Sequence, residues 1–541
     1  MSGGTSDVTI VGSGASAVHF VQTALERGLR VTMVDVGRPR PAPVRPDDSF
    51  AELKAKLDDP WRYFLGPRFE GVLFPGKKGE YYGFPPHKEY IFEGVDGYTV
   101  EAQGFEPLAS FARGGLAEAW TGGSFPFNDD ELEDFPFRYD ELGPFYDEVA
   151  RRIGIVGADD DLARFMPVHR HLDAPLDLDR HAQLLLERYA KVRERMNADG
   201  AYFGRSRAAV LRPEHDGRDG RKGCDYLGRC LWTCPRESLY TPAMTLERLL
   251  GRPGFTYLDR RFVTHFRFEG GKVRAVALVD LSTQRTEELD VERLVLAAGT
   301  LPTSKIVLDS IWRAKGERVR LVGLMDNRQT LVPFANLKLL GARWDPDTYQ
   351  YHQLAFGLAG ARPKEYVHGL VTTLKTALIH PIALSAPLDL ATATWLTKNV
   401  HGALGIVNVN LHDTRREESW LELATGDGER TKLVARYEPA PSEPADRKRA
   451  LARIKRALWQ LGCFVPPGMA HVRPMGASVH YSGTLPMSTK RAPLTVDRDC
   501  RSHDFSNLWI ADGATFPFLP AKNLTFTLMA NAARIATKLV V

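Results

Sequence analysis

The N-terminal segment "DVTIVGSGASAVHFVQTALERGLRVTMVDV" constrains the fold of this chain more than any other. A short apolar run over residues 8–11 precedes a glycine turn, apolar residues then recur at helical spacing, and Gly28 ends the helix before a second apolar run. This order predicts a βαβ unit. Gly12 allows the tight turn, and Gly14 lets backbone amides approach a pyrophosphate at the start of a helix near Ala15.

Two further positions support a dinucleotide site. Ala17 takes the third small position of the G-x-G-x-x-A pattern, where helix and strand pack closely. Asp35 lies 23 positions after Gly12, at the end of the second strand, where a carboxylate can accept hydrogen bonds from ribose hydroxyls. In this context the motif predicts dinucleotide binding rather than an accidental glycine turn.

A later segment indicates which dinucleotide is bound. "ERLVLAAGTLPTSKIVLDS", residues 292–310, is typical of a buried strand followed by a helix, and it comes after several short predicted strands with a turn at Gly270 and Gly271. Flavoproteins with an N-terminal dinucleotide fold commonly carry such a late strand beside the first one. The sequence therefore favours FAD over NAD.

Size and charge limit the class of protein. A chain of 541 residues predicts two intertwined domains or one large two-part enzyme. The formal charge of +4 is spread along the chain, so no nucleic acid is expected as a partner. No signal-peptide pattern precedes the first strand, which predicts a cytoplasmic protein. The most apolar long segment, 370–396, is interrupted by charged residues and prolines and is interpreted as buried core, so no membrane partner is expected.

Taken together, these motifs resemble the glucose-methanol-choline (GMC) oxidoreductase family. The resemblance rests on the N-terminal fingerprint, "RGGLAEAWTGG" at 113–123, "LVLAAGTLPTSKIVL" and the C-terminal stretch 480–536. It is nearest to the sugar-oxidising, pyranose oxidase-like branch, and the resemblance leaves open that the chain is an aminoglycoside or amino-sugar oxidase. The implied fold is α/β, with a Rossmann-like FAD-binding domain and an inserted α+β substrate-binding domain.

The resemblance also implies a division of the chain. The discontinuous FAD-binding domain is expected over 1–50, 95–160, 208–311 and 475–541. The substrate-binding domain is expected over 161–207 and 312–474, with 51–94 as a connecting or lid region. Residues 168–207 and 312–474 match no family motif, and substrate identity is expected to be encoded there.

Several site residues follow from the family pattern. His480, Gly483 and Thr484 match the H-x-x-G-T motif that carries the catalytic histidine, and Asn523 matches the second catalytic position. Besides Gly12, Gly14, Ala15 and Asp35, the implied cofactor contacts are Gly114, Gly115, Trp120, Thr121, Val263, Ala298, Asp512, Gly513, Asn523 and Thr525.

The predicted reaction is oxidation of an alcohol to a carbonyl by hydride transfer to FAD. His480 is the predicted base, because an ordinary histidine pKa of ~6.5 leaves a neutral nitrogen near physiological pH. Asn523 would hold the substrate oxygen through its amide. An alternative interpretation makes Asn523 a helix N-cap, alone or in addition. The expected substrate is a sugar, amino sugar or cyclitol, with natural-product biosynthesis such as that of antibiotics as a context.

Two departures from the family pattern matter. Ala119 stands where the sugar-oxidising branch can link a histidine covalently to the flavin, which implies non-covalent FAD. Asp35 replaces the usual glutamate at the end of the second strand. Molecular oxygen or a separate electron carrier would reoxidise the flavin, with oxygen favoured.

Other functions stay open from the sequence. A hydroxynitrile lyase-like enzyme would keep FAD and still use His480 as base. Cys224, Cys230 and Cys234 would serve a dehydrogenase if they held an iron–sulfur cluster, although a structural loop without metal is favoured. The acidic run at 128–135 either attracts a cationic amino sugar or, as favoured, forms an exposed loop.

Overall fold

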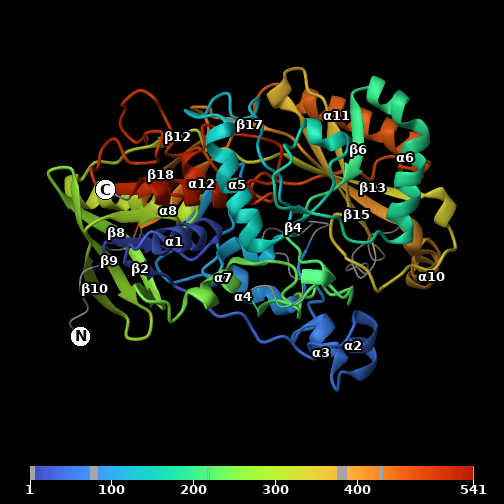
Figure 1. Ribbon diagram of the computed structural model, residues 1–541, viewed down its shortest axis with the longest axis horizontal. Helices are drawn as coiled ribbons and strands as arrows, with labels where there is room; N and C mark the ends of the chain where they lie inside the picture. The colour runs from blue at the N-terminus through green and yellow to red at the C-terminus, as the bar shows by residue number, and fades with distance from the viewer. Residues whose placement is uncertain are drawn as a thin grey trace.

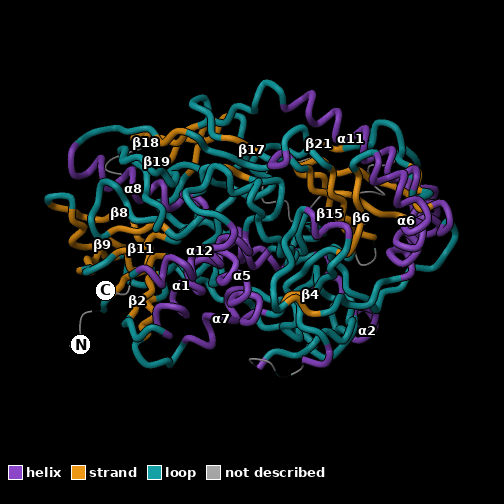
Figure 2. The backbone as a smooth tube through the Cα atoms, turned by 45° about the horizontal axis from the view of Figure 1, so that its top comes forward, coloured by secondary structure: helices purple, strands orange, loops and turns teal. Residues whose placement is uncertain are grey.

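The computed structural model describes residues 6–539 apart from 73–82, 216, 218–219, 375–386 and 426–430. Two groups of strands lie in opposite halves of the molecule (Figures 1 and 2). Helices α5 (Tyr139–Ile153) and α12 (Thr525–Lys538) lie between them. The α/β fold expected from the sequence is confirmed.

The predicted βαβ unit is present as β1 (Val8–Val11), α1 (Ala15–Glu26) and β2 (Val31–Val34). These strands join the parallel sheet β22-β11-β1-β2-β7, and α1 packs against α12. The late strand predicted beside β1 is β11, paired in parallel with it, and α8 follows it. The added elements are β7 (Phe255–Leu258), β11 (Leu294–Leu296), β22 (Leu508–Ile510) and α8 (Thr300–Lys315).

A small antiparallel sheet covers α8. It has the order β10-β9-β8 and corresponds to the short strands predicted before residue 292. Its strands are β8 (Arg261–Glu269), β9 (Lys272–Asp280) and β10 (Arg285–Asp290).

The other half is built on an antiparallel sheet of seven strands. Its order is β20-β13-β16-β15-β14-β6, with β21 also paired to β13. Helices α6 (Arg180–Ala198) and α11 (Glu443–Gln460) cover one face, where side chains such as Val332 and Val407 form a separate core with them. The strands are β6 (Ala201–Arg205), β13 (Gln329–Asn336), β14 (Leu354–Leu358), β15 (Val367–Thr373), β16 (Leu404–Asn410), β20 (Cys463–Phe464) and β21 (His471–Val472).

A four-stranded sheet, β12-β18-β19-β3, bears on the domain boundaries. β3 (Val100–Gln103) lies beside β19 (Thr431–Arg436), which is followed by β18 (Trp420–Thr425) and β12 (Leu321–Val322). Leu321, Leu421 and Leu433 belong to the same core as the dinucleotide sheet. These strands thus pack with the FAD-binding half, although they fall in the predicted substrate-binding span. The division itself stays a prediction.

The remaining elements are short. Among the described residues, α2 and α3 lie together at one edge (Figure 1). The bounds are α2 (Phe50–Lys56), α3 (Pro60–Leu65), α4 (Glu89–Phe92), α7 (Pro242–Leu249), α10 (Leu390–Val400), β4 (Ile155–Val156), β5 (Leu172–Asp173), β17 (Asp413–Thr414) and β23 (Phe518–Leu519).

The interpretation of 370–396 as buried core is partly wrong. β15 is buried, and 375–386 lie outside the described residues. In α10, however, only Ala393 is buried, while Leu390 and Trp395 are 66% and 64% exposed. No helix in the described part of the chain has the length and apolarity needed for a membrane crossing.

Candidate active site

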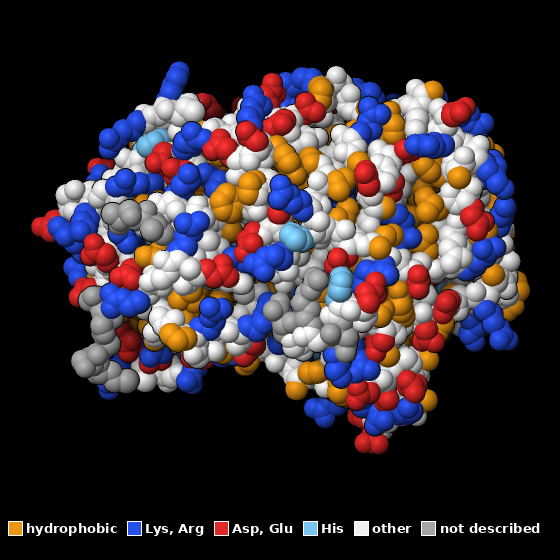
Figure 3. Space-filling view, in the orientation of Figure 1, with side chains coloured by type: hydrophobic (Ala, Val, Ile, Leu, Met, Phe, Trp, Pro, Cys, Tyr) orange, Lys and Arg blue, Asp and Glu red, His pale blue; other side chains and the backbone are white. Residues whose placement is uncertain are grey.

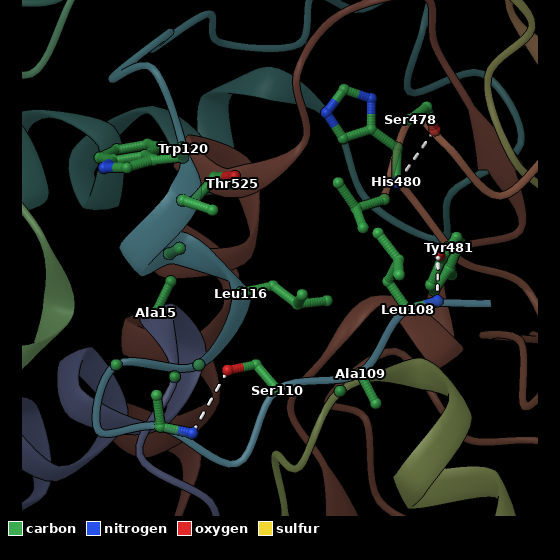
Figure 4. A pocket seen from close by; sticks show the side chains of 18 of the residues that line it. Ala15, Leu108, Ala109, Ser110, Leu116, Trp120, Ser478, His480, Tyr481 and Thr525 are labelled. Carbon is green, nitrogen blue, oxygen red and sulfur yellow. Dashed lines mark hydrogen bonds between the residues drawn. The ribbon is translucent and has the colours of Figure 1, made fainter. Parts of the chain in front are cut away.

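A cavity of about 400 Å³ lies between the dinucleotide sheet and the seven-stranded sheet. It is lined by the ends of β1, β2 and β11 on one side and by β13, β15 and β16 on the other. Every site residue expected from the sequence lines this one cavity: Gly12, Gly14, Ala15, Asp35, Gly114, Gly115, Trp120, Thr121, Val263, Ala298, His480, Asp512, Gly513, Asn523 and Thr525. Figure 4 shows Ala15, Trp120 and Thr525 across the open space from His480.

The glycine turn has the shape of an anion cradle. Gly12 has a φ of +100°, and a Cβ there would lie 2.6 Å from the carbonyl oxygen of Ala297, so only glycine fits. α1 starts at Ala15 without a side-chain cap and without an acidic residue in its first turn. Its unpaired N–H groups therefore meet the cavity where a pyrophosphate would lie. Gly115 closes the cradle, since a Cβ there would approach the Cα of Gly14 to 3.4 Å.

Two carboxylates line the cofactor end. Asp35 accepts hydrogen bonds from the Ser13 hydroxyl and from the Tyr257 hydroxyl at 3.1 Å, and burial raises its pKa to about 6. Asp512 accepts from the Gly299 amide at 3.0 Å and from the Thr303 hydroxyl, and burial again raises the pKa to about 6. Asp512 thus ties the end of β22 to the start of α8.

His480 is 8% exposed and sits between two asparagines. Its Nδ1 lies 2.8 Å from Asn327 Oδ1, and its Nε2 lies 3.2 Å from Asn523 Nδ2. Burial, with a smaller contribution from the Arg473 guanidinium, lowers the pKa of His480 to about 4. The imidazole is therefore neutral at pH 7 and able to accept a proton.

The rest of the H-x-x-G-T motif supports this histidine. Gly483 has a φ of +90°, and a Cβ there would lie 2.5 Å from the Gly323 carbonyl oxygen, which requires glycine. The Thr484 hydroxyl lies 2.8 Å from the Ser304 hydroxyl on α8. The motif thus anchors the segment that follows His480 to the dinucleotide half.

The N-cap interpretation of Asn523 is wrong. α12 begins at Thr525, its N-cap residue is Leu524, and no side chain caps it. The Asn523 amide instead reaches His480, and its Oδ1 is buried with no hydrogen-bond partner among the described residues. A buried, unsatisfied acceptor at the cavity wall is suited to a hydroxyl donor.

A buried ion pair holds the residue before Asn523. The Lys522 ammonium donates to the Glu131 carboxylate and to the carbonyl oxygen of Pro126 at 3.0 Å, and both charged side chains are at most 1% exposed. Glu131 belongs to the acidic run 128–135, which therefore is not uniformly an exposed loop. No residue of this run lines the cavity, and Glu133 and Asp134 pair with Lys364 at 2.7 and 2.9 Å, which gives the steering hypothesis no support.

The cavity wall formed by the seven-stranded sheet was missed by motif reasoning. On the cavity side of the seven-stranded sheet, Leu331, Asn408 and Leu370 are neighbours in register across β13, β16 and β15. The alternate residues Val332, Val407 and Val371 point into the core with α6 and α11. The signal was present in "GIVNVN", because a polar residue at every second position marks the face that is not core. Gln329, His352, Thr372 and Arg473 complete the polar part of this wall.

The cysteine segment packs as a loop beside the cavity. Cys224, Cys230 and Cys234 lie in a small apolar cluster with Tyr349 and Tyr351, and burial raises the pKa of the Cys224 thiol. All five cysteines of the chain are described, and none forms a disulfide. Within the described ranges, no group of three His, Cys, Asp or Glu residues is arranged to hold a metal ion, so the iron–sulfur alternative gains no support.

Comparison with known proteins identifies the class. Residues 467–532 match the family model described as GMC oxidoreductase. The chain is 24% identical over 550 residues to C-glycoside 3-oxidase of Microbacterium trichothecenolyticum, covering 98% of this chain and 95% of the relative. It is 23% identical to 6'''-hydroxyparomomycin C oxidase of Streptomyces lividus, covering 98% and 90%.

Solved structures agree in fold. Pyridoxine 4-oxidase from Mesorbium loti aligns with a TM-score of 0.60 at 16% identity, covering 99% of both chains. Formate oxidase aligns with a TM-score of 0.61 at 12% identity, covering 100% of this chain and 98% of that one.

The comparisons show an FAD-dependent oxidoreductase. Residues 467–532 match the C-terminal domain model of GMC oxidoreductases, and the whole chain shares its fold with solved GMC oxidases. The resemblance inferred from the sequence is confirmed, and FAD is the cofactor.

Proposed function

We propose that this protein oxidises a hydroxyl group of a sugar, amino sugar or cyclitol to a carbonyl, with His480 as base and Asn523 as the group that holds the reacting oxygen. The observation that carries the proposal is the approach of His480 Nε2 to Asn523 Nδ2, 3.2 Å, in the same cavity as the glycine cradle. Both side chains come from the C-terminal segment that matches the GMC family model.

Oxidation of the alcohol removes a proton from the hydroxyl oxygen and a hydride from the carbon that bears it. FAD, when bound, supplies the hydride acceptor. His480 takes the hydroxyl proton, and its lowered pKa keeps it neutral and ready to do so over most of the pH range. Asn523 donates a hydrogen bond to the substrate oxygen and stabilises the negative charge that develops there. Its unpartnered Oδ1 can accept from a neighbouring hydroxyl.

The opposite wall supports a substrate with both polar and apolar faces. Asn408 Oδ1 is buried without a partner among the described residues, and Leu331 and Leu370 flank it in register. A sugar ring presents C–H groups on its faces and hydroxyls at its rim, which matches this alternation. The cation of Arg473 lines the same region, so a neutral sugar or cyclitol fits better than an ammonium group placed beside it.

Known relatives support the same substrate class and electron acceptor. The two aligned over nearly the whole chain are named as oxidases of a C-glycoside and of 6'''-hydroxyparomomycin C, in line with a sugar-type alcohol and with oxygen as acceptor. Ala119 lines the cavity and offers no atom for a covalent link, which supports non-covalent FAD. A role in natural-product biosynthesis and a cytoplasmic location are part of the proposal.

The test is anaerobic mixing of the FAD-loaded protein with a panel of sugars, cyclitols and aminoglycosides. Bleaching of the flavin absorbance by at least one neutral member, followed by peroxide when oxygen is admitted, is the expected result. Bleaching without peroxide would keep the dehydrogenation but replace oxygen by another acceptor. If no alcohol bleaches the flavin while a cyanohydrin is cleaved, the lyase alternative replaces this function.

A further inference from the structure

A hydrogen bond joins the side chain of Asn327 to the imidazole of His480. Asn327 is 1% exposed and lies two residues before β13, in a segment that matches no motif of the family. We propose that Asn327 is a positioning residue that holds His480 in the tautomer protonated at Nδ1, so that the lone pair of Nε2 faces the substrate. This inference rests on the proposed role of His480 as base.

The direction of the Asn327 amide follows from its other partners. Its Nδ2 donates to the carbonyl oxygen of Leu411 at 2.8 Å and to that of Pro520 at 3.0 Å. Carbonyl oxygens only accept, so the opposite orientation would set Oδ1 against two acceptors and lose both hydrogen bonds. Oδ1 is therefore the atom that faces His480 Nδ1 at 2.8 Å.

The tautomer follows from the chemistry of that contact. Because an amide oxygen is only an acceptor, Nδ1 must carry the hydrogen. A neutral imidazole has one N–H, so Nε2 keeps its lone pair. The donor Nδ2 of Asn523 lies 3.2 Å from Nε2, as a lone pair there requires. In the complex, the substrate hydroxyl would replace this amide as the donor to Nε2.

Surrounding contacts keep both partners in place. Asn327 ties the end of β16, through Leu411, to the end of β23, through Pro520. The neighbouring Asp326 accepts hydrogen bonds from the Gly476 amide at 2.6 Å and from the Ser478 hydroxyl. The His480 amide in turn donates to Ser478 Oγ at 3.0 Å, as the dashed line in Figure 4 marks. The backbone of the histidine is thus fixed independently of its ring.

Loss of the Asn327 oxygen would free the other tautomer. Without an acceptor at Nδ1, a hydrogen on Nε2 becomes favourable, because the unpartnered Oδ1 of Asn523 can turn to accept it. That tautomer presents an N–H, and not a lone pair, to the substrate hydroxyl. Proton removal would then need a prior tautomer exchange, which slows the reaction without removing a substrate contact.

The direct test is nitrogen NMR of the FAD-loaded protein labelled with ¹⁵N-histidine, in which nitrogen shifts and ring-proton couplings distinguish the two tautomers. The His480 signals are assigned by their absence in His480→Ala. The native protein is expected to show Nδ1–H, and Asn327→Leu is expected to populate Nε2–H. Asn327→Asp should retain the native tautomer in its protonated form, in which one oxygen accepts from Nδ1–H and the other donates to the Leu411 or Pro520 carbonyl oxygen.

Asn507→Leu is the matched control. Asn507 is also buried, and its amide bonds backbone groups of Val273 and Glu292, outside the cavity lining. This variant loses a comparable buried amide but should keep the native His480 signals. In rapid-mixing experiments Asn327→Leu should slow flavin reduction on the order of 10- to 100-fold, with substrate affinity nearly unchanged.

Two results would overturn the inference. One is a native protein with Nε2–H, and the other is a Nδ1–H signal that persists in Asn327→Leu. Neither result depends on finding the substrate. If no alcohol reduces the flavin but the tautomer is as proposed, the proposed function is rejected and the inference about Asn327 stands. If Asn327→Leu does not fold, the tautomers of the native protein and of Asn327→Asp still test whether Asn327 holds His480 in the Nδ1–H form.

Discussion

The lowered pKa of His480 has a measurable consequence for the pH dependence of the reaction. With a pKa of about 4, about 97% of this imidazole is neutral at pH 5.5, whereas a histidine at ~6.5 would be about 9% neutral. If His480 is the base, the rate constant for flavin reduction at pH 5.5 should be lower than its value at pH 8 by no more than about 10%. An unperturbed histidine would give about a ten-fold fall over the same range.

The assay is anaerobic stopped-flow reduction of the flavin by saturating substrate between pH 5 and pH 8. Excess FAD must be present, because the pKa of Asp35 at the cofactor end is about 6 and its protonation would weaken a ribose contact in the lower part of this range. Replacing Arg473 with methionine removes a nearby positive charge, so the pKa of His480 should rise and the acidic limb should move to higher pH.

Two variants test whether His480 is the base that determines the pH dependence of flavin reduction. His480→Gln should lower the reduction rate on the order of 10²- to 10⁴-fold and keep FAD. His352→Gln is the control, because His352 lines the same cavity, has a pKa lowered to about 4 by burial and bonds the Thr372 hydroxyl at 2.9 Å. A native rate that falls ten-fold around pH 6.5, or a loss confined to His352→Gln, would refute this reasoning.

Three further substitutions test other parts of the cavity. Gly12→Ala should abolish FAD retention, since the new Cβ would lie 2.6 Å from the Ala297 carbonyl oxygen. Gly28→Ala is the control: Gly28 also has a positive φ, but its new Cβ would have no atom within 4 Å, so this variant should keep the flavin spectrum. Asn408→Leu should raise KM about 2- to 10-fold with little change in kcat, as expected for one lost hydrogen bond, whereas Asn410→Leu, outside the cavity lining, should leave KM alone. Lys522→Met leaves Glu131 as a buried unpaired charge and should lower the free energy of unfolding, measured by calorimetry, by about 3–5 kcal/mol. Adding Glu131→Gln should recover part of this stability. Equal stability of the single and double variants would contradict the ion-pair argument.

Local patterns were enough to predict the glycine turn and the helix that follows it. The turn at Gly12 and the helix at Ala15 lie within one continuous segment, so the spacing that makes the cradle is written in neighbouring residues. His480 was predicted as the base from a short motif of the family that it resembles, and Gly483 of that motif is required by the backbone conformation.

The substrate wall and the positioning residue depend on contacts between distant segments. Asn327 meets His480 across 153 positions of sequence, and the register that sets Asn408 between Leu331 and Leu370 is a property of the assembled sheet. Asn523 was ambiguous for the opposite reason. An asparagine just before a helix satisfies the local N-cap pattern, and only the tertiary position of the imidazole shows that the amide is used elsewhere.

The geometry of the proposed catalytic pair therefore depends on how the two halves of the molecule pack together. His480 and Asn523 come from the segment that packs with the dinucleotide core, but the oxygen that faces His480 Nδ1 comes from Asn327, next to a strand of the seven-stranded sheet. Lys522 in turn connects the loop of Asn523 to Glu131. A shift of the seven-stranded sheet would alter the wall that contacts the substrate and the tautomer of the base together. Substrate recognition and proton transfer are for this reason expected to change jointly when residues behind this sheet are replaced.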